Sequence, residues 1–182
     1  MLSTSDINKI LQEADCLFSS AQVEESLDKM ADSLTQDLEF TNPLFISVLT
    51  GAMIPTGHLL TRLQFPLEID YIHVTRYDGD IKGTHLKWVV EPRSSLQDRT
   101  VVIVDDIYDE GYTLDAIVQY CKAKGASQIK SVVLVEKDHL RGMNLSADYI
   151  GLKVPDRYVF GYGMDYKGYL RNANGIYAVK GL

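Results

Sequence analysis

The chain has 182 residues, of which 46% are hydrophobic and 24% charged, a composition that suits one compact domain and excludes a disordered or collagen-like chain. Eighteen basic residues against 25 acidic ones give a net charge of −7, which disfavours nucleic-acid binding because the protein surface repels phosphate. No stretch approaches the ~20 apolar residues of a membrane span, the first residues do not resemble a signal peptide, and Cys16 and Cys121 lie in no metal-binding spacing. We expect a single cytoplasmic domain over residues 1–182 that binds neither membranes nor nucleic acid.

The first half of the chain is expected to begin with two helices, because apolar side chains recur there every three or four residues. Ser19 and Gln22 resemble a capping box before the second helix, and Asn42-Pro43 follows its end. A polar, glycine-containing loop is expected at residues 78–83. The predicted elements are helices at 7–14 and 23–38, a strand at 44–49, a turn at 50–52, a helix from 55 to 63, and strands at 67–75 and 85–90.

The second half begins with the β-branched run at residues 101–104, which lacks alternation and is typical of a parallel strand covered on both faces. A helix at 114–121, closed by Gly125, and a strand at 129–135 follow. The tail is rich in Tyr and Gly and has short apolar stretches at 149–152, 158–160 and 176–179. Strands that alternate with helices predict an α/β fold with a mainly parallel sheet.

Four carboxylates follow the strand at 101–104, at the end of the sheet where α/β proteins bind ligands. Asp105, Asp106, Asp109 and Glu110 stand within six residues and repel one another unless a cation or hydroxyl donors lie between them. Oxygen ligands favour magnesium or calcium over zinc, and magnesium commonly accompanies a phosphorylated substrate. The pattern therefore predicts a site for a cation or a hydroxyl-rich ligand.

The end of this acidic turn has the opposite character. Gly111 can adopt positive φ, and Thr113 stands in the first turn of the next predicted helix, where free amides attract anions. Carboxylates for hydroxyl groups and amides for phosphate together match a ribose 5-phosphate. The alternative is an exposed acidic turn that only caps a helix.

Residues 101–113 resemble the phosphoribosyl-pyrophosphate signature of type I phosphoribosyltransferases: a hydrophobic strand, two acidic residues, two further residues, Asp, one residue, Gly, one residue and Thr. The resemblance implies the fold of that family, with a mainly parallel sheet flanked by helices and a small hood formed by the terminal segments. It also implies a donor site. The phosphoribosyl-pyrophosphate ligands would include Asp105, Asp106, Asp109, Glu110, Gly111, Tyr112 and Thr113. The family commonly has a hydroxyl residue beside the 5-phosphate at the position of Glu110. A carboxylate there would repel the phosphate, so we expect the Glu110 side chain to point away from it.

Leu49-Thr50-Gly51-Ala52 resembles the pyrophosphate loop of hypoxanthine-guanine phosphoribosyltransferases, with Thr50 in place of a common lysine. The resemblance implies that Thr50 and Gly51 bind pyrophosphate and that the backbone here contains a cis peptide. From the residues alone, a plain strand-to-helix turn is an equal alternative.

Thr75-Arg76-Tyr77 and the loop that follows resemble the lid that closes over the active site in the family. The resemblance implies that Arg76 and Tyr77 belong to this lid, which would exclude water from the reacting ribose. An ordinary surface hairpin has the same polarity and remains the alternative.

The segment from Pro155 to Tyr166 resembles the base-binding segment of the family. The resemblance implies that Tyr158 stacks on a purine, that the Val159 backbone contacts its edge, and that Asp165 lies near the base and helps to hold magnesium. It further places Ile107 beside the base, Lys137 at the exocyclic oxygen of the purine and Arg171 at pyrophosphate. Without the family, Lys137 would be interpreted as a solvated strand-end lysine, and Tyr162 and Tyr166 as core residues.

These resemblances cover nearly the whole chain and point to bacterial hypoxanthine-guanine phosphoribosyltransferases. They imply transfer of a 5-phosphoribosyl group to hypoxanthine, guanine or both, with Asp109 as general base. They also imply magnesium held by Asp105, Asp106 and Asp165, and a homodimer or homotetramer. The alternatives are an enzyme that prefers xanthine and a non-catalytic regulator that binds nucleotides or RNA. The four histidines lie in no ligand spacing and are expected to be ordinary surface or core residues: His58, His73, His85 and His139.

Overall fold

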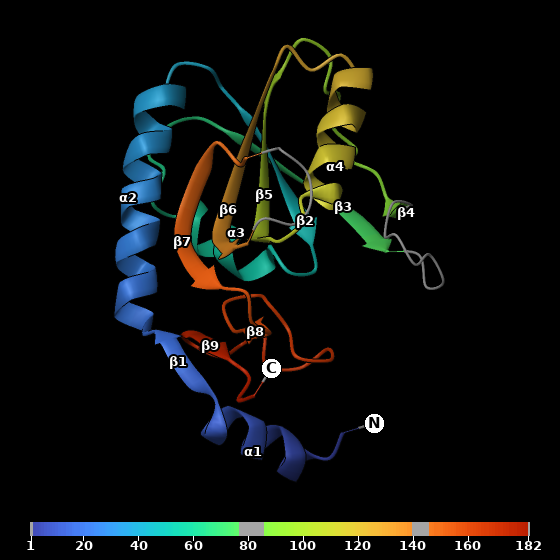
Figure 1. Ribbon diagram of the computed structural model, residues 1–182. Helices are drawn as coiled ribbons and strands as arrows, with labels where there is room; N and C mark the ends of the chain where they lie inside the picture. Colours follow the sequence, from blue (N-terminus) through green and yellow to red (C-terminus); the bar gives the residue numbers. More distant parts are fainter. Residues whose placement is uncertain (1, 77–85, 140–145, 182) are drawn as a thin grey trace.

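A computed structural model describes residues 2–76, 86–139 and 146–181 (Figure 1). Its centre is a six-stranded sheet of order β4-β3-β2-β5-β6-β7, in which only β4 runs antiparallel to its neighbour. The predicted α/β fold with a mainly parallel sheet is confirmed. The strands are β2 (Leu44–Leu49), β3 (Glu68–Arg76), β4 (Leu86–Val90), β5 (Thr100–Tyr108), β6 (Gln128–Asp138) and β7 (Tyr149–Pro155).

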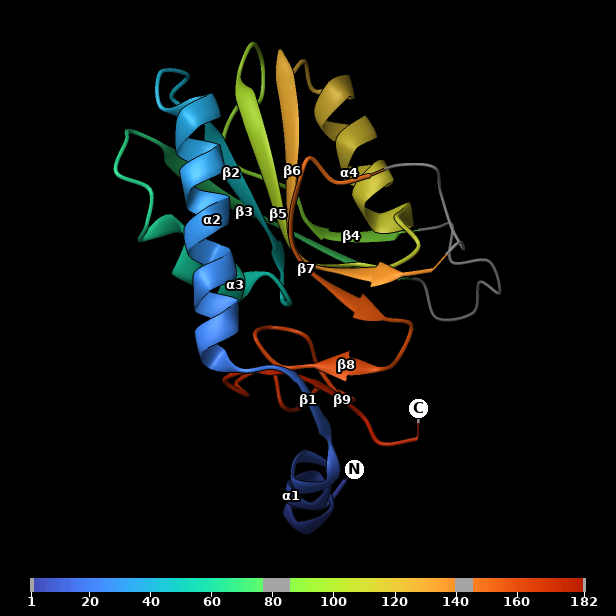
Figure 2. The ribbon, with the colours of Figure 1, turned by 60° about the vertical axis from the view of Figure 1, so that its left-hand side comes forward.

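Helices cover both faces of this sheet: α2 (Ser20–Leu38) and α3 (Met53–Leu60) on one, and α4 (Tyr112–Ala123) on the other (Figures 1 and 2). Successive side chains of a strand point to opposite faces. Val102 and Val104 accordingly pack in the same core as α2, whereas Val101 and Ile103 pack in the core that contains α4. Double burial is the physical reason that β5 has no apolar–polar alternation.

A second, antiparallel sheet of order β1-β9-β8 lies beyond the carboxyl ends of the central strands (Figure 1). It contains β1 (Asp15–Phe18), β8 (Val159–Phe160) and β9 (Ile176–Ala178), so its strands come from both terminal segments. Helix α1 (Thr4–Glu13) packs on it through Ile10, beside the buried ring of Phe160. This is the predicted hood. Its strand β1 has only four residues and was not predicted.

Two central strands are longer than the sequence predicts. The strand expected at 101–104 continues to Tyr108, because Asp105 pairs with Val133 and Ile107 with Val135 on β6. The prediction that Asp105 and Asp106 follow the strand as part of a turn is therefore wrong, because both lie within β5. The strand predicted at 129–135 likewise continues to Asp138, so that Lys137 lies within it.

None of the helices in the described part of the chain combines the length and the apolar character needed to cross a bilayer.

Candidate active site

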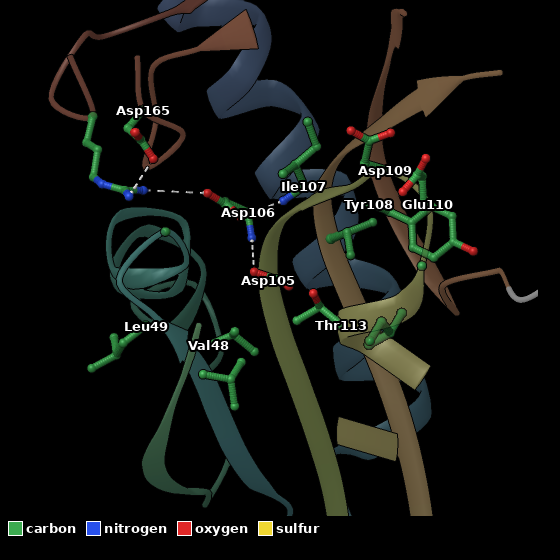
Figure 3. A pocket seen from close by; sticks show the side chains of 16 residues that line it. Val48, Leu49, Asp105, Asp106, Ile107, Tyr108, Asp109, Glu110, Thr113 and Asp165 are labelled. Atoms are coloured by element: carbon green, nitrogen blue, oxygen red, sulfur yellow. Dashed lines mark hydrogen bonds and ion pairs between the residues drawn. The ribbon is translucent and has the colours of Figure 1, made fainter. Parts of the chain in front are cut away.

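A cavity of about 350 Å³ opens at the carboxyl ends of β2 and β5, below the hood (Figure 3). It is bordered by the pyrophosphate-loop candidate, the acidic segment, the start of α4 and two side chains of the hood. The predicted residues among its lining are Gly51, Asp105, Asp106, Ile107, Asp109, Glu110, Gly111, Thr113, Asp165 and Arg171.

Asp105 and Asp106 form a buried pair of carboxyls on this cavity. The Asp106 amide donates to Asp105 Oδ1 at 2.9 Å, and the Ile107 amide donates to Asp106 Oδ1 at 2.9 Å. Burial raises the pKa of Asp105 well above its ordinary value, and the neighbouring Asp106 charge adds to this. Burial also raises the pKa of Asp106, although contacts with Asp105 and the Arg171 charge oppose it. Both carboxyls can be ionised together only when cations or hydroxyl donors approach them.

Arg171 connects the hood to this pair. Its guanidinium donates to the Gly163 carbonyl at 2.5 Å and lies 2.5 Å from Asp165 Oδ1 and 3.9 Å from Asp106 Oδ2. Asp165 also accepts from the Gly168 amide at 2.7 Å. A guanidinium held against two carboxylates keeps a fixed orientation, and Arg171 lines the cavity.

Backbone conformation explains the glycine after the acidic residues. Gly111 has φ +83° and caps α4. A Cβ here would also lie 2.5 Å from the Tyr108 hydroxyl, so the turn requires glycine for its φ and for its space. Gly111 and Thr113 line the cavity at the N-terminus of α4, and free amides at a helix N-terminus stabilise anions.

The loop after β2 approaches the hood through backbone atoms. A Cβ on Gly163, whose φ is +105°, would lie 2.0 Å from the Gly51 carbonyl oxygen, and a Cβ on Gly51 would lie 2.0 Å from Asp106 Oδ2. The Leu49–Thr50 peptide is cis, as the family resemblance implied. Leu49 and Gly51 border the cavity, whereas Thr50 is exposed and is not among its lining residues.

A smaller cavity of about 210 Å³ adjoins the first, and it is lined by Lys137, Tyr158, Val159 and Met164 among others. The Tyr158 ring is 41% exposed and meets Tyr166 edge to face, with centroids 5.3 Å apart. An accessible aromatic face beside an apolar wall and a lysine suits a flat heterocycle. The predicted base-binding residues are therefore brought together.

Asp109 stands between the two cavities and has two basic neighbours. Lys137 Nζ lies 3.0 Å from Asp109 Oδ2, and His139 Nε2 lies 2.6 Å from Asp109 Oδ1. Partial burial would raise the pKa of Asp109, but the hydrogen bonds and charges of Lys137 and His139 outweigh it and hold this pKa below its ordinary value. Asp109 is consequently ionised at neutral pH.

Some predicted residues lie apart from the cavities or outside the described structure. Tyr112 begins α4 but does not line either cavity. Arg76 ends β3, and Tyr77 with the rest of the predicted lid lies outside the described residues. Glu110 borders the larger cavity, and its orientation toward a phosphate stays a prediction. Tyr162 and Tyr166 are buried, as their core interpretation expected.

His139 was missed by sequence reasoning, which treated it as an ordinary histidine. It follows β6 two residues after Lys137, and side chains two residues apart in an extended chain point to the same side. That spacing was the available signal, but it becomes informative only once Lys137 is known to face Asp109.

Comparisons with known proteins agree with this geometry. The model of the phosphoribosyl transferase domain family matches residues 14–167. The chain is 34% identical over 169 residues to the bifunctional protein TilS/HprT of Listeria monocytogenes, covering 92% of this chain but only 25% of that protein. It is 32% identical to the hypoxanthine-guanine phosphoribosyltransferase of Bacillus subtilis, covering 92% of this chain and 90% of the relative.

A solved structure gives the same result for the fold. The crystal structure of a hypoxanthine phosphoribosyltransferase from Staphylococcus aureus is similar with a TM-score of 0.89 and 25% identity, over 99% of this chain and 97% of the other. The family match, the fold and the acidic segment at the strand end lead to one assignment: this chain belongs to the phosphoribosyl transferase domain family.

Proposed function

We propose that this protein transfers the 5-phosphoribosyl group of phosphoribosyl pyrophosphate to a 6-oxopurine, hypoxanthine or guanine, giving IMP or GMP and pyrophosphate. One observation carries the proposal: the two cavities share a wall, so a donor in the larger and a base in the smaller would meet there. The shared residues are Asp106, Ile107, Asp109 and Asp165.

The larger cavity would hold the donor in three parts. The 5-phosphate would bind the amides after Gly111 and the Thr113 hydroxyl at the start of α4. The ribose hydroxyls would bind Asp105 and Asp106, and their binding offsets the cost of ionising two buried carboxyls. The diphosphate would bind near Gly51 and Arg171. A guanidinium suits this group because it donates two hydrogen bonds in one plane.

The smaller cavity would hold the base. Tyr158 offers a ring face for stacking, the backbone of buried Val159 would contact the base edge, and Ile107 forms an apolar side of the pocket. Lys137 would donate to the exocyclic oxygen of the purine, a contact that adenine cannot make. This favours hypoxanthine, guanine or xanthine over adenine.

The reaction needs a base for the N7 proton of the purine, whose N9 attacks the ribose C1, and it needs negative charge near that carbon. Asp109 is ionised and stands on the shared wall, so we assign it the role of general base for the N7 proton. As pyrophosphate leaves, positive charge develops at the ribose C1, and the neighbouring carboxylates stabilise it electrostatically.

Magnesium fits the donor set beside the diphosphate position. Asp105, Asp106 and Asp165 offer only oxygen atoms, which this ion prefers, and Arg171 offsets part of their charge. We propose that these three aspartates help to hold Mg²⁺, which when bound would neutralise the leaving pyrophosphate.

The direct test is an assay with phosphoribosyl pyrophosphate, Mg²⁺ and each purine in turn, with nucleotide followed by chromatography. We expect IMP or GMP with hypoxanthine or guanine and no AMP with adenine. Product from xanthine alone would instead identify the xanthine-preferring enzyme. Binding of RNA in a gel-shift assay without transfer to any base would favour a regulator and overturn the proposal.

Removal of the metal should abolish turnover. Excess chelator is expected to stop pyrophosphate release, because without the metal the charge of the leaving diphosphate is not neutralised. Added Mg²⁺ should restore release. Release is measured by chromatographic separation of radiolabelled pyrophosphate from the donor, which needs no metal-dependent coupling enzyme. Undiminished turnover in excess chelator would contradict the metal assignment.

We further propose that the protein acts in the cytoplasm as a homodimer or homotetramer. Both cysteines are free, as a reducing compartment would keep them. Exposed apolar side chains on β3 and β4, Ile69, Tyr71 and Val89, offer a surface for association. Sedimentation equilibrium would give the number of subunits.

A further inference from the structure

His139 makes the shortest described contact to the proposed general base. Its Nε2 lies 2.6 Å from Asp109 Oδ1, and only 7% of its side chain is exposed. A short hydrogen bond to a carboxylate in a largely buried position orients both groups more strongly than a solvated ion pair does.

Lys137 and His139 each contact a different oxygen of the Asp109 carboxylate. Lys137 Nζ bonds Oδ2 and His139 Nε2 bonds Oδ1, so each oxygen has its own partner. Under the proposed function, Lys137 has a second acceptor, the exocyclic oxygen of the purine. Once Lys137 turns toward the base, His139 is the partner still committed to Asp109.

We propose that His139 is a positioning residue: it holds the Asp109 carboxylate in the orientation and the ionised state in which it accepts the purine N7 proton while Lys137 binds the base. This inference rests on the proposed function. No step beyond transfer of the N7 proton to an Asp109 oxygen is invoked, and the imidazole itself does not touch the substrate.

A metal site is the competing interpretation, because Asp109, His139 and Asp156 bring one possible ligand atom each within 4.8 Å of one another. Two contacts disfavour it. Lys137 already places a positive charge 3.0 Å from Asp109, and the imidazole nitrogen that would bind a metal is in a direct hydrogen bond with the carboxylate. Asp156 instead adds a second carboxylate near the imidazole.

The charged groups around Asp109 come from several elements. Burial raises the pKa of Asp109, and the hydrogen bonds and charges of Lys137 and His139 lower it below its ordinary value. The groups to be considered are Lys137 on β6, His139 after it, Asp156 after β7, Glu110 in the same turn, and Asp106 and Asp165 across the smaller cavity.

The kinetic test compares His139→Ala, which removes the donor, with His139→Gln, whose amide can replace the Nε2 hydrogen. General-base catalysis contributes about 10²–10⁴-fold, so loss of its orientation in His139→Ala should lower kcat about 10-fold or more. The KM for phosphoribosyl pyrophosphate should stay within about twofold, and His139→Gln should recover most of kcat. His58→Gln is the matched control, because His58 pairs with Glu24 at 3.0 Å outside both cavities.

A second measurement does not depend on turnover: titration of the Asp109 carboxyl carbon by NMR in the wild type and both variants. The pKa of Asp109 should rise in His139→Ala and rise less in His139→Gln. An unmoved Asp109 titration, equal loss of kcat in both variants, or Zn²⁺ binding that His139→Ala abolishes would each overturn the proposal. If the wild type has no transferase activity but the Asp109 pKa still rises in His139→Ala, the proposed function is refuted and the His139–Asp109 contact is established.

Discussion

Replacing Asp109 by asparagine is expected to lower kcat by about 10²-fold or more, while affinity for phosphoribosyl pyrophosphate changes only a few-fold. Asparagine keeps the size and can still accept a hydrogen bond through its one amide oxygen, but it cannot accept the N7 proton. The proposed donor contacts at Asp105, Asp106 and Arg171 do not involve the Asp109 side chain. Steady-state kinetics with varied donor, together with calorimetric binding of the donor, separate the two effects.

Asp138→Asn is the matched control for this substitution. Asp138 ends β6 between Lys137 and His139, but it is exposed, and alternation along the extended chain turns it to the other side. The Asp138→Asn variant also loses one negative charge close to Lys137 and His139, and it should keep the wild-type kcat. Wild-type turnover in Asp109→Asn would remove Asp109 from the role of general base.

Gly163→Ala is expected to destabilise the folded protein strongly. The new Cβ would lie 2.0 Å from the Gly51 carbonyl oxygen, a backbone atom, and φ is +105°. Positive φ and overpacking together cost about 2–5 kcal/mol of the free energy of unfolding. Relief by displacement would move the Gly163 carbonyl that holds Arg171, so kcat/KM should fall at least ~10-fold even in folded protein.

Gly168→Ala distinguishes the clash from the backbone conformation. Its φ is +86°, yet nothing lies within 4 Å of the position of a Cβ. It should therefore lose only about 1–2 kcal/mol of the free energy of unfolding. Urea unfolding of both variants provides the comparison, and equal losses of stability would show that contact with Gly51 is unimportant.

Local patterns made the central sheet and the acidic segment predictable. The β-branched run at 101–104 is sufficient to indicate a doubly covered strand, and helix α4 follows from the apolar spacing of Leu114, Ile117 and Cys121. The sequence also indicated donor and base candidates, because most of them belong to three short motifs, at residues 49–52, 105–113 and 155–166.

Features that depend on contacts across the sheet were not predictable in the same way. The extension of β5 through Asp105 depends on pairing with β6, which overrides the low strand preference of aspartate. Strand β1 exists because β9 pairs with it from the other end of the chain. The contact of His139 with Asp109 joins positions 30 residues apart, and only the register of β5 against β6 brings them together.

The strand order of the hood has a consequence for the synthesis of the protein. Because β9 lies between β1 and β8, β1 has no neighbour in this sheet until β9, the last strand of the described chain, has been synthesised. The parallel strands β2, β3, β5, β6 and β7 are complete by Pro155, so the part of the donor site formed by the sheet and α4 can assemble before Asp165 and Arg171 of the hood have been synthesised. The base half assembles only after Ala178 has emerged. Until then, the nascent chain has the groups for a reactive sugar phosphate but no hood above them.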